Sequence, residues 1–125
     1  MSWIEESLFS YLNEQIAPAG GVWPIIRPQE GVLPAITYAR VSGPREYAMD
    51  GQVLAKGTFD VHCYAARYDL VKDLAEQVRI ALSAYHEEEA SEVVRVYYVL
   101  NEIDHYEEDT NTFIVLLEIE IHYKE

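Results

Sequence analysis

Apolar residues recur with helical spacing in two stretches of the chain, which predicts two amphipathic helices. In the first stretch these residues are Trp3, Ile4, Leu8, Leu12 and Ile16. Pro18 and the Gly20-Gly21 pair are expected to end this helix. The second helix is expected over 68–85, where the apolar stripe consists of Leu70, Leu74, Val78, Ala81, Leu82 and Tyr85.

Strict alternation of apolar and polar residues predicts the β-strands. It is most regular in the last strand, whose apolar face is formed by Phe113, Val115, Leu117, Ile119, Ile121 and Tyr123. The strand over 53–65 has an apolar face of Val53, Ala55, Phe59, Val61, Cys63 and Ala65. Shorter strands are expected over 22–26, at an edge because of Pro24, and over 36–42.

A further strand over 93–103 is apolar on both faces, which indicates a central position in the sheet. We expect it to form a hairpin with the last strand, through a polar turn at 104–111. The crossover from the strand over 53–65 through the second helix would allow a parallel pairing with the strand over 93–103.

The order of these elements predicts an α+β fold, with a largely antiparallel four- to five-stranded sheet and two helices packed on one face. We expect one domain spanning residues 1–125, since no linker or internal repeat interrupts the pattern. The segment 43–52 has few apolar residues and is expected to be the most mobile loop. The glutamates at 87–89 are expected to form a solvated link after the second helix.

The formal net charge is −13, and it is concentrated in the last third of the chain. From residue 86 onward there are twelve acidic residues and only two basic residues, Arg95 and Lys124. The first 85 residues contain ten acidic and seven basic residues. Such a field disfavours contact with nucleic acid and with anionic membranes. The single Cys63 and the lack of a signal-peptide or membrane-span pattern predict a soluble protein made in the cytoplasm.

No group of residues has the spacing of a catalytic site or a cofactor site. His86 is followed by glutamates, but Ala90 stands where a second zinc ligand would be needed, so we expect a frayed helix end there. Cys63 lies on an apolar strand face, opposite His62, and is expected to be a buried, inert thiol. We therefore expect no enzymatic activity and no cofactor.

Two groups of carboxylates are candidate sites. The acidic group at 104–109 lacks the spacing of a calcium loop, so a solvated hairpin tip is favoured over a cation site. Glu118 and Glu120 share one side of the last strand, where acid–base chemistry is possible. Without the marks of a substrate pocket, a solvated or interface-lining sheet face is the favoured interpretation.

Five segments of the chain resemble the phage tail completion (tail terminator, head–tail joining) proteins. They are Val22-Trp23-Pro24, Arg27-Pro28-Gln29-Glu30-Gly31, Pro34-Ala35-Ile36-Thr37-Tyr38, Phe59-Asp60-Val61-His62-Cys63-Tyr64-Ala65 and Leu74-Ala75-Glu76-Gln77-Val78-Arg79-Ile80-Ala81-Leu82. The resemblance covers about two thirds of the chain and carries no catalytic signature. It implies a structural protein of virion assembly, located at the head-proximal end of the tail.

The same resemblance implies the partners and the mechanism. A homohexameric ring would sit on the last ring of tail tube protein, block further polymerisation, and offer its other face to the head–tail connector protein. No membrane contact and no specific nucleic-acid binding are implied. The residues that we expect in the interaction loops are Gly43, Pro44, Arg45, Glu46, Tyr47, Asp50, His105, Tyr106, Glu107 and Glu108.

Two other functions fit parts of the sequence. The charge of −13 also suits a small acidic inhibitor, or a DNA mimic that occupies a basic nucleic-acid site on a partner. A small-molecule enzyme has only scattered histidines and glutamates in its favour.

Overall fold

The computed structural model describes residues 4–26, 31–42, 45–47, 53–83, 85–89 and 92–124. Nine elements occur in these ranges. They are α1 (Ile4–Gln15), β1 (Val22–Pro24), β2 (Ala35–Ser42), β3 (Arg45–Tyr47), β4 (Val53–Ala65), α2 (Tyr68–Leu82), β5 (His86–Glu89), β6 (Glu92–Glu107) and β7 (Thr112–Lys124).

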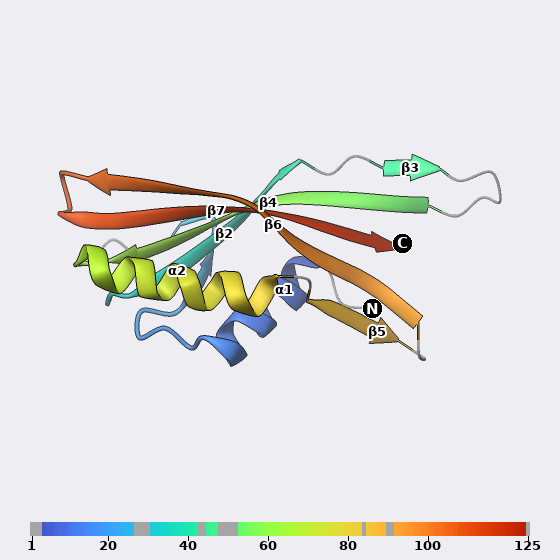
Figure 1. Cartoon of the computed structure of the whole chain (residues 1–125), viewed down its shortest axis with the longest axis horizontal. Helices are drawn as coiled ribbons and strands as arrows, with labels where there is room; N and C mark the ends of the chain where they lie inside the picture. Colours follow the sequence, from blue (N-terminus) through green and yellow to red (C-terminus); the bar gives the residue numbers. More distant parts are fainter. Residues whose placement is uncertain are drawn as a thin grey trace.

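The strands form one twisted sheet with the order β1-β2-β4-β7-β6-β5, and β3 pairs with β4 outside this path. Both helices lie on the same side of the sheet (Figure 1). The predicted α+β class, with a largely antiparallel sheet and two helices on one face, is confirmed. The expected strands correspond to β1, β2, β4, β6 and β7, whereas β3 and β5 are short additions in segments that we expected to be loops.

The predicted parallel pairing was wrong, because β7 lies between β4 and β6. β7 pairs antiparallel with β4 along nearly its whole length, from Leu54↔Lys124 to Ala65↔Phe113. It forms the predicted hairpin with β6 on its other side. The only parallel pairing among the described strands joins β1 to β2.

The helices cover one face of the sheet, and the core lies between the helices and this face. The inward residues of β4 and β7 are fully buried as their alternation predicted: Phe59, Val61, Cys63, Ala65, Val115, Leu117, Ile119 and Ile121. Leu8 and Leu12 of α1 pack in the same cluster. Burying one large apolar side chain contributes ~1.5–3 kcal/mol, so this face supplies the main driving force for folding.

The second helix is shorter than predicted, and its buried face is rotated. Leu70 is 44% exposed, whereas the buried residues are Val71, Leu74, Ala75, Val78 and Leu82. Tyr85 lies beyond the helix end and stacks on Tyr11, with ring centroids 3.8 Å apart. The sequence is compatible with the predicted stripe through Leu70 and with the observed stripe through Val71 and Ala75. Packing against the sheet selects the second stripe, in which the small side chain of Ala75 is buried.

The segment 86–89 is the strand β5, so the expected helix end at His86 and the expected acidic link were wrong. β5 pairs with the start of β6, from His86↔Val96 to Glu89↔Glu92. The amide of Tyr97 donates a hydrogen bond to the carbonyl of Tyr85 at 2.8 Å, which begins this pairing directly after the helix. Backbone pairing with β6 therefore continues directly from the end of α2.

The β6–β7 hairpin is longer than predicted. β6 continues to Glu107, and the turn is confined to residues 108–111, where Asn111 takes a φ of 51°. A bulge between Val99 and Asn101 shifts the phase of β6 relative to β7. β6 is central only near its start, since β5 pairs with it only as far as Val96.

The described part of the chain contains no helix that is both long enough and apolar enough to cross a membrane.

Candidate interaction surfaces

The face of the sheet opposite the helices, which we call the open face, has a different composition from the core. Directly paired residues of antiparallel strands point to the same side. The pairings Thr58↔Glu120, Asp60↔Glu118 and His62↔Leu116 therefore place carboxylates and imidazole together on the open face. These positions are partly exposed. The prediction that Glu118 and Glu120 share one side of β7 is confirmed.

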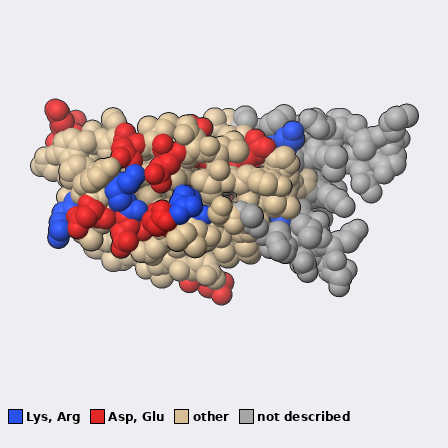
Figure 2. All heavy atoms as spheres, in the orientation of Figure 1, with Lys and Arg blue, Asp and Glu red and all other residues tan. Residues whose placement is uncertain are grey.

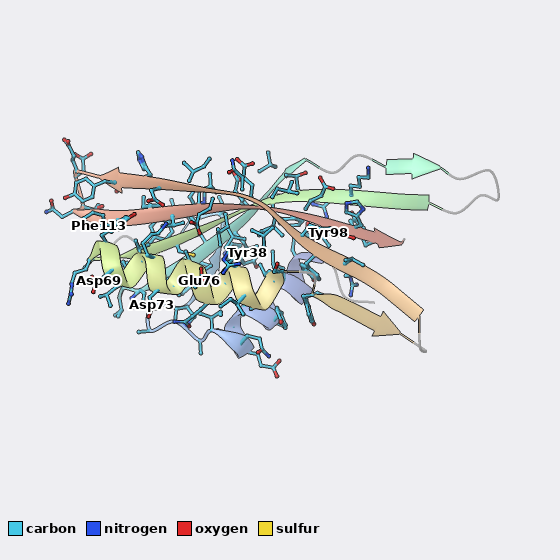
Figure 3. The ribbon with its side chains drawn as sticks, viewed as in Figure 1. Tyr38, Asp69, Asp73, Glu76, Tyr98 and Phe113 are labelled. Atoms are coloured by element: carbon cyan, nitrogen blue, oxygen red, sulfur yellow. The ribbon has the colours of Figure 1, made fainter. Side chains whose placement is uncertain are left out.

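Rings and polar groups of the open face contact one another. Tyr98 meets the ring of His122 edge-on at 5.1 Å, and Nε2 of His122 contacts Oε1 of Glu120. The hydroxyl groups of Thr37 and Tyr64 are hydrogen-bonded at 3.1 Å. Figure 3 marks Tyr98 on β6. These contacts orient the side chains of the face without forming a nucleophile–base pair.

His62 is the histidine of this face whose titration is perturbed. Partial burial lowers its pKa below the ordinary value, and the nearby Asp60 carboxylate opposes that shift. The imidazole of His62 is therefore held mainly neutral near pH 7.

A hollow of about 410 Å³ lies on the open face at the turn end of the β6–β7 hairpin. Its lining residues are His62, Tyr64, Ile103, Asp104, His105, Glu107, Ile114 and Leu116. Two of the predicted interaction residues, His105 and Glu107, are brought together here. The lining combines apolar and aromatic side chains with the imidazoles of His62 and His105 and with the acidic residue Glu107.

The other hairpin residues among the predicted interaction residues lie elsewhere. Tyr106 is on the helix side, where its ring packs 4.8 Å from that of Phe113 and its hydroxyl donates to Oδ1 of Asn111 at 3.0 Å. Glu108 belongs to the turn itself. The bulge in β6 shifts the register after Val99, so His105 and Tyr106 point to the opposite sides from those that a regular strand would give them.

The predicted loop around Arg45 is only partly described. Gly43, Pro44 and Asp50 lie outside the described residues. Residues 45–47 are the strand β3, with Arg45↔Ala55 and Tyr47↔Val53 as pairs, so a loop was the wrong expectation for them. β4 extends past its last pairing with β2 at Thr58, which leaves an edge that β3 uses.

Asp104 is part of a cluster on the helix side rather than of a solvated turn. The hydroxyl of Tyr68 donates to Oδ2 of Asp104 at 2.7 Å, and Nζ of Lys72 donates to Oδ1 of Asp104 and to Oε2 of Glu102 at 3.1 Å. The Tyr68 and Lys72 hydrogen bonds lower the pKa of Asp104, and the same carboxylates raise the pKa of Lys72. This cluster joins α2 to β6.

Acidic and basic side chains alternate over the region of α2 (Figure 2). The exposed carboxylates Asp69, Asp73 and Glu76 follow one another along the solvent side of the helix (Figure 3). Among the described residues, no group of three or more histidine, cysteine or acidic side chains is placed to hold a metal ion.

Cys63 is fully buried in the core, and burial raises the pKa of its thiol to about 12. The thiolate needed for nucleophilic chemistry is therefore not populated near neutral pH. The prediction that Cys63 is buried is confirmed.

An exposed apolar surface at the β1 edge was missed by the sequence analysis. We call it the β1 tip and define it as Trp23, Ile25, Ile26 and Val32, of which Ile25 is 77% and Ile26 72% exposed. The strand ends at Pro24, not at residue 26 as predicted, because Ile25 takes a φ of 65°. The apolar run from Val22 to Ile26 was a usable signal, but we read it as a strand.

Comparisons with known proteins point to one family. Residues 13–124 match the family described as "Tail completion protein gp17". No curated protein matches the sequence. Among solved structures, the fold is similar to a chain of the "Virion of native gene transfer agent (GTA) particle". That similarity has a TM-score of 0.55 at 16% sequence identity and covers 91% of this chain and 84% of the other.

The family match spans nearly all described elements, from the end of α1 to the end of β7, and so includes the C-terminal third in which we found no matching motif. The predicted resemblance is thereby confirmed. The chain belongs to the tail completion protein gp17 family and is a structural protein of the virion tail.

Proposed function

We propose that this protein ends the tail tube of a phage or phage-like particle as a homo-oligomeric, hexameric ring, and that the ring joins the tail to the head. The observation that carries the proposal is the family match over residues 13–124. A protein of the tail is held in the particle by contacts with its other proteins. In this proposal those partners are the tube protein on one side and the head–tail connector protein on the other.

The unlike edges of the sheet support ring formation. A closed ring of identical subunits needs heterologous contacts, in which one surface of a subunit meets a different surface of the next. The β1 edge carries exposed apolar side chains, whereas β6 at the other side carries Glu102, Asp104 and Glu107. Two edges of such different composition are unlike surfaces, as a heterologous contact requires.

The open face suits the inner surface of such a ring. It carries Asp60, Glu118 and Glu120 at partly exposed positions. Carboxylates that line a channel repel DNA phosphates, so a genome passing through would not adhere to the wall. The channel would then act through its geometry and charge, without specific binding of nucleic acid.

The proposed role is structural and not catalytic. The thiol of Cys63 is buried and protonated. The contact between Glu120 and His122 joins two neighbours on one side of β7. The head-proximal location and assembly in the host cytoplasm follow from the same proposal.

The proposal is tested with purified tail tube protein that is polymerising in solution. We expect substoichiometric amounts of this protein to shorten the tubes seen by electron microscopy, with one ring-shaped density at one end of each tube. Unchanged tube lengths and bare ends at a molar excess would contradict the proposal. A DNA mimic would instead bind a basic nuclease or polymerase and dissociate from it as salt is added.

A further inference from the structure

Among the described strands, β6 has the longest stretch that is paired on one side only. β7 pairs with β6 as far as Glu107, whereas β5 pairs with it only as far as Val96. The amide of Tyr97 is still bonded to the carbonyl of Tyr85. The remaining residues 98–107, which we call the β6 edge, have β7 on one side and no described strand on the other. This stretch is at least as long as an ordinary complete strand.

The two other outer edges of the described sheet are short. β1 has three residues and ends at Pro24, which has no amide hydrogen to donate. Ile25 then takes a φ of 65°, which ends the strand conformation. β5 is limited to His86–Glu89. A strand from another molecule would therefore find the most room for pairing at the β6 edge.

The side chains of the β6 edge would favour such pairing. Tyr98, Leu100, Ile103 and Tyr106 are between 41% and 54% exposed. Unpaired backbone groups beside exposed apolar side chains are a template for pairing with another chain. Without some protection, an edge of this composition would let copies of the protein join sheet to sheet.

A bulge interrupts the β6 edge near its start. Val99 and Asn101 pair with consecutive residues of β7, so Leu100 is the extra residue between them. A bulge bends its strand, increases the local twist and breaks the even spacing of amides and carbonyls along it. An incoming strand needs that even spacing, and bulges are one of the devices that protect natural sheet edges from pairing.

Two further features follow the bulge. The amide of Glu102 donates to Oδ1 of Asn101 at 3.0 Å, so this donor is satisfied within its own strand. Nζ of Lys72 donates to the carboxylates of Glu102 and Asp104, each at 3.1 Å. Two carboxylates and one ammonium group leave this cluster with a net negative charge. It therefore repels the same cluster of a second copy.

We propose that the bulge at Leu100, the hydrogen bond between Asn101 and Glu102, and the acidic cluster of Glu102 and Asp104 together protect the β6 edge from pairing with the sheet of another copy. This protection limits how copies of the chain assemble. A contact at the β6 edge is made by side chains, and the sheet does not continue from one copy into the next. The inference is independent of the proposed ring, because it applies equally to a single subunit in solution.

The pairing pattern allows the bulge to be removed without turning other side chains to the opposite face. Val99 and Asn101 already pair with neighbouring residues of β7. If Leu100 is deleted, they become neighbours themselves, so both halves of β6 keep their register and their inward residues. The fully buried Tyr97 stays in the core. The deletion should therefore give a folded protein with a regular, less protected edge.

The test compares full-length variants by sedimentation velocity over a concentration series, and infrared spectroscopy detects sheets that run between molecules. Deletion of Leu100 should lower the concentration at which the wild-type species join into larger ones roughly tenfold or more, because each contact gains several backbone hydrogen bonds. Leu100→Ala is the matched control, since it removes the exposed side chain and keeps the extra residue. Its mass should remain that of the wild type.

Two more variants separate the parts of the protection. Asn101→Val removes the acceptor of the Glu102 amide and keeps the bulge, so it should promote association more weakly than the deletion does. Ile103→Lys, added to the deletion variant, should restore the wild-type mass, because a lysine on an edge strand opposes pairing. Circular dichroism and the melting temperature show whether each variant is folded.

Each outcome supports or overturns the proposal. It is wrong if the folded deletion variant sediments as the wild type does at every concentration, or if Leu100→Ala associates as strongly as the deletion. If the deletion variant does not fold, Asn101→Val decides, and unchanged association in that variant overturns the proposal. A wild type that forms no ring and leaves tail tubes unshortened would refute the proposed function and leave these comparisons intact.

Discussion

The two faces of the sheet are built from the same strands, one residue out of phase, and yet they differ in almost every property. On β7 the side chain of Leu117 is fully buried under the helices, and its neighbour Glu118 is partly exposed on the open face. The covered face is a continuous apolar layer, whereas the open face mixes carboxylate, imidazole and aromatic groups. Folding constrains the first face tightly, which leaves the composition of the second free for recognition.

A substitution on each face gives the largest contrast. Leu117→Asp should unfold the protein, because an unpaired buried charge costs several kcal/mol out of a total stability of roughly 5–15 kcal/mol. Glu118→Ala should leave stability within about 0.5 kcal/mol of the wild type. Thermal melting followed by circular dichroism measures both. Equal melting temperatures would show that the strand has been assigned to the wrong side.

The polar cluster between α2 and β6 tests whether charge contributes to the covered side. Lys72→Ala should cost only about 0.2–1 kcal/mol, because Lys72 and Asp104 are both partly exposed to solvent. Urea unfolding of Lys72→Ala, Asp104→Asn and the double variant gives the coupling energy directly. If Lys72→Ala lowered the free energy of unfolding as much as Leu117→Asp does, the partly exposed ion pairs would contribute as much to stability as the buried apolar contacts, and the comparison would fail.

The same cluster predicts a pH dependence with a definite sign. The pKa of Asp104 is lowered in the folded state, so its contribution to stability is present above the unfolded pKa and is lost as the pH falls through the folded pKa. The stability difference between wild type and Asp104→Asn should therefore vanish in acid. A difference that grew on acidification would contradict the assignment of Asp104 as the ionised partner.

The smallest expected effect concerns His62 on the open face. Its pKa is lowered by burial and held up by Asp60, so Asp60→Asn should lower it further. Because the unfolded chain binds the proton more readily, the contribution of His62 to stability decreases as the pH falls through about 6.5. Titration of the ring signals by NMR measures both pKa values. An unchanged pKa of His62 in the variant would show that Asp60 is too far away to act.

The sequence was sufficient to predict the parts of the fold that depend on local periodicity. The alternation in β4 and β7 identified the buried residues correctly, and the two helices were placed on one face. The stripe of α2 was misassigned at Leu70, since the sequence fits two rotations and packing selects one. The bulge after Val99 and the pairing of β3 and β5 depend on partners distant in the chain, which no local pattern encodes.

The candidate surfaces were predictable only in fragments. His105 and Glu107 were selected as interaction residues, but the hollow also needs His62 and Tyr64, about forty residues earlier and brought near only by the β4–β7 pairing. The exposure of Ile25 depends on a positive φ that is unusual for isoleucine. That the chain is one domain, and that these residues bind other subunits, stay predictions.

The most direct test of the proposed tail-completion ring is the solution mass of the protein, measured by light scattering across a salt series with and without tail tube protein. The repulsion between acidic subunits is screened over about 8–10 Å at 0.1–0.15 M salt. We therefore expect the fraction of ring to rise as salt is added, and the ring to bind the tube. A strict monomer at every concentration and salt, which also fails to bind the tube, would contradict the account.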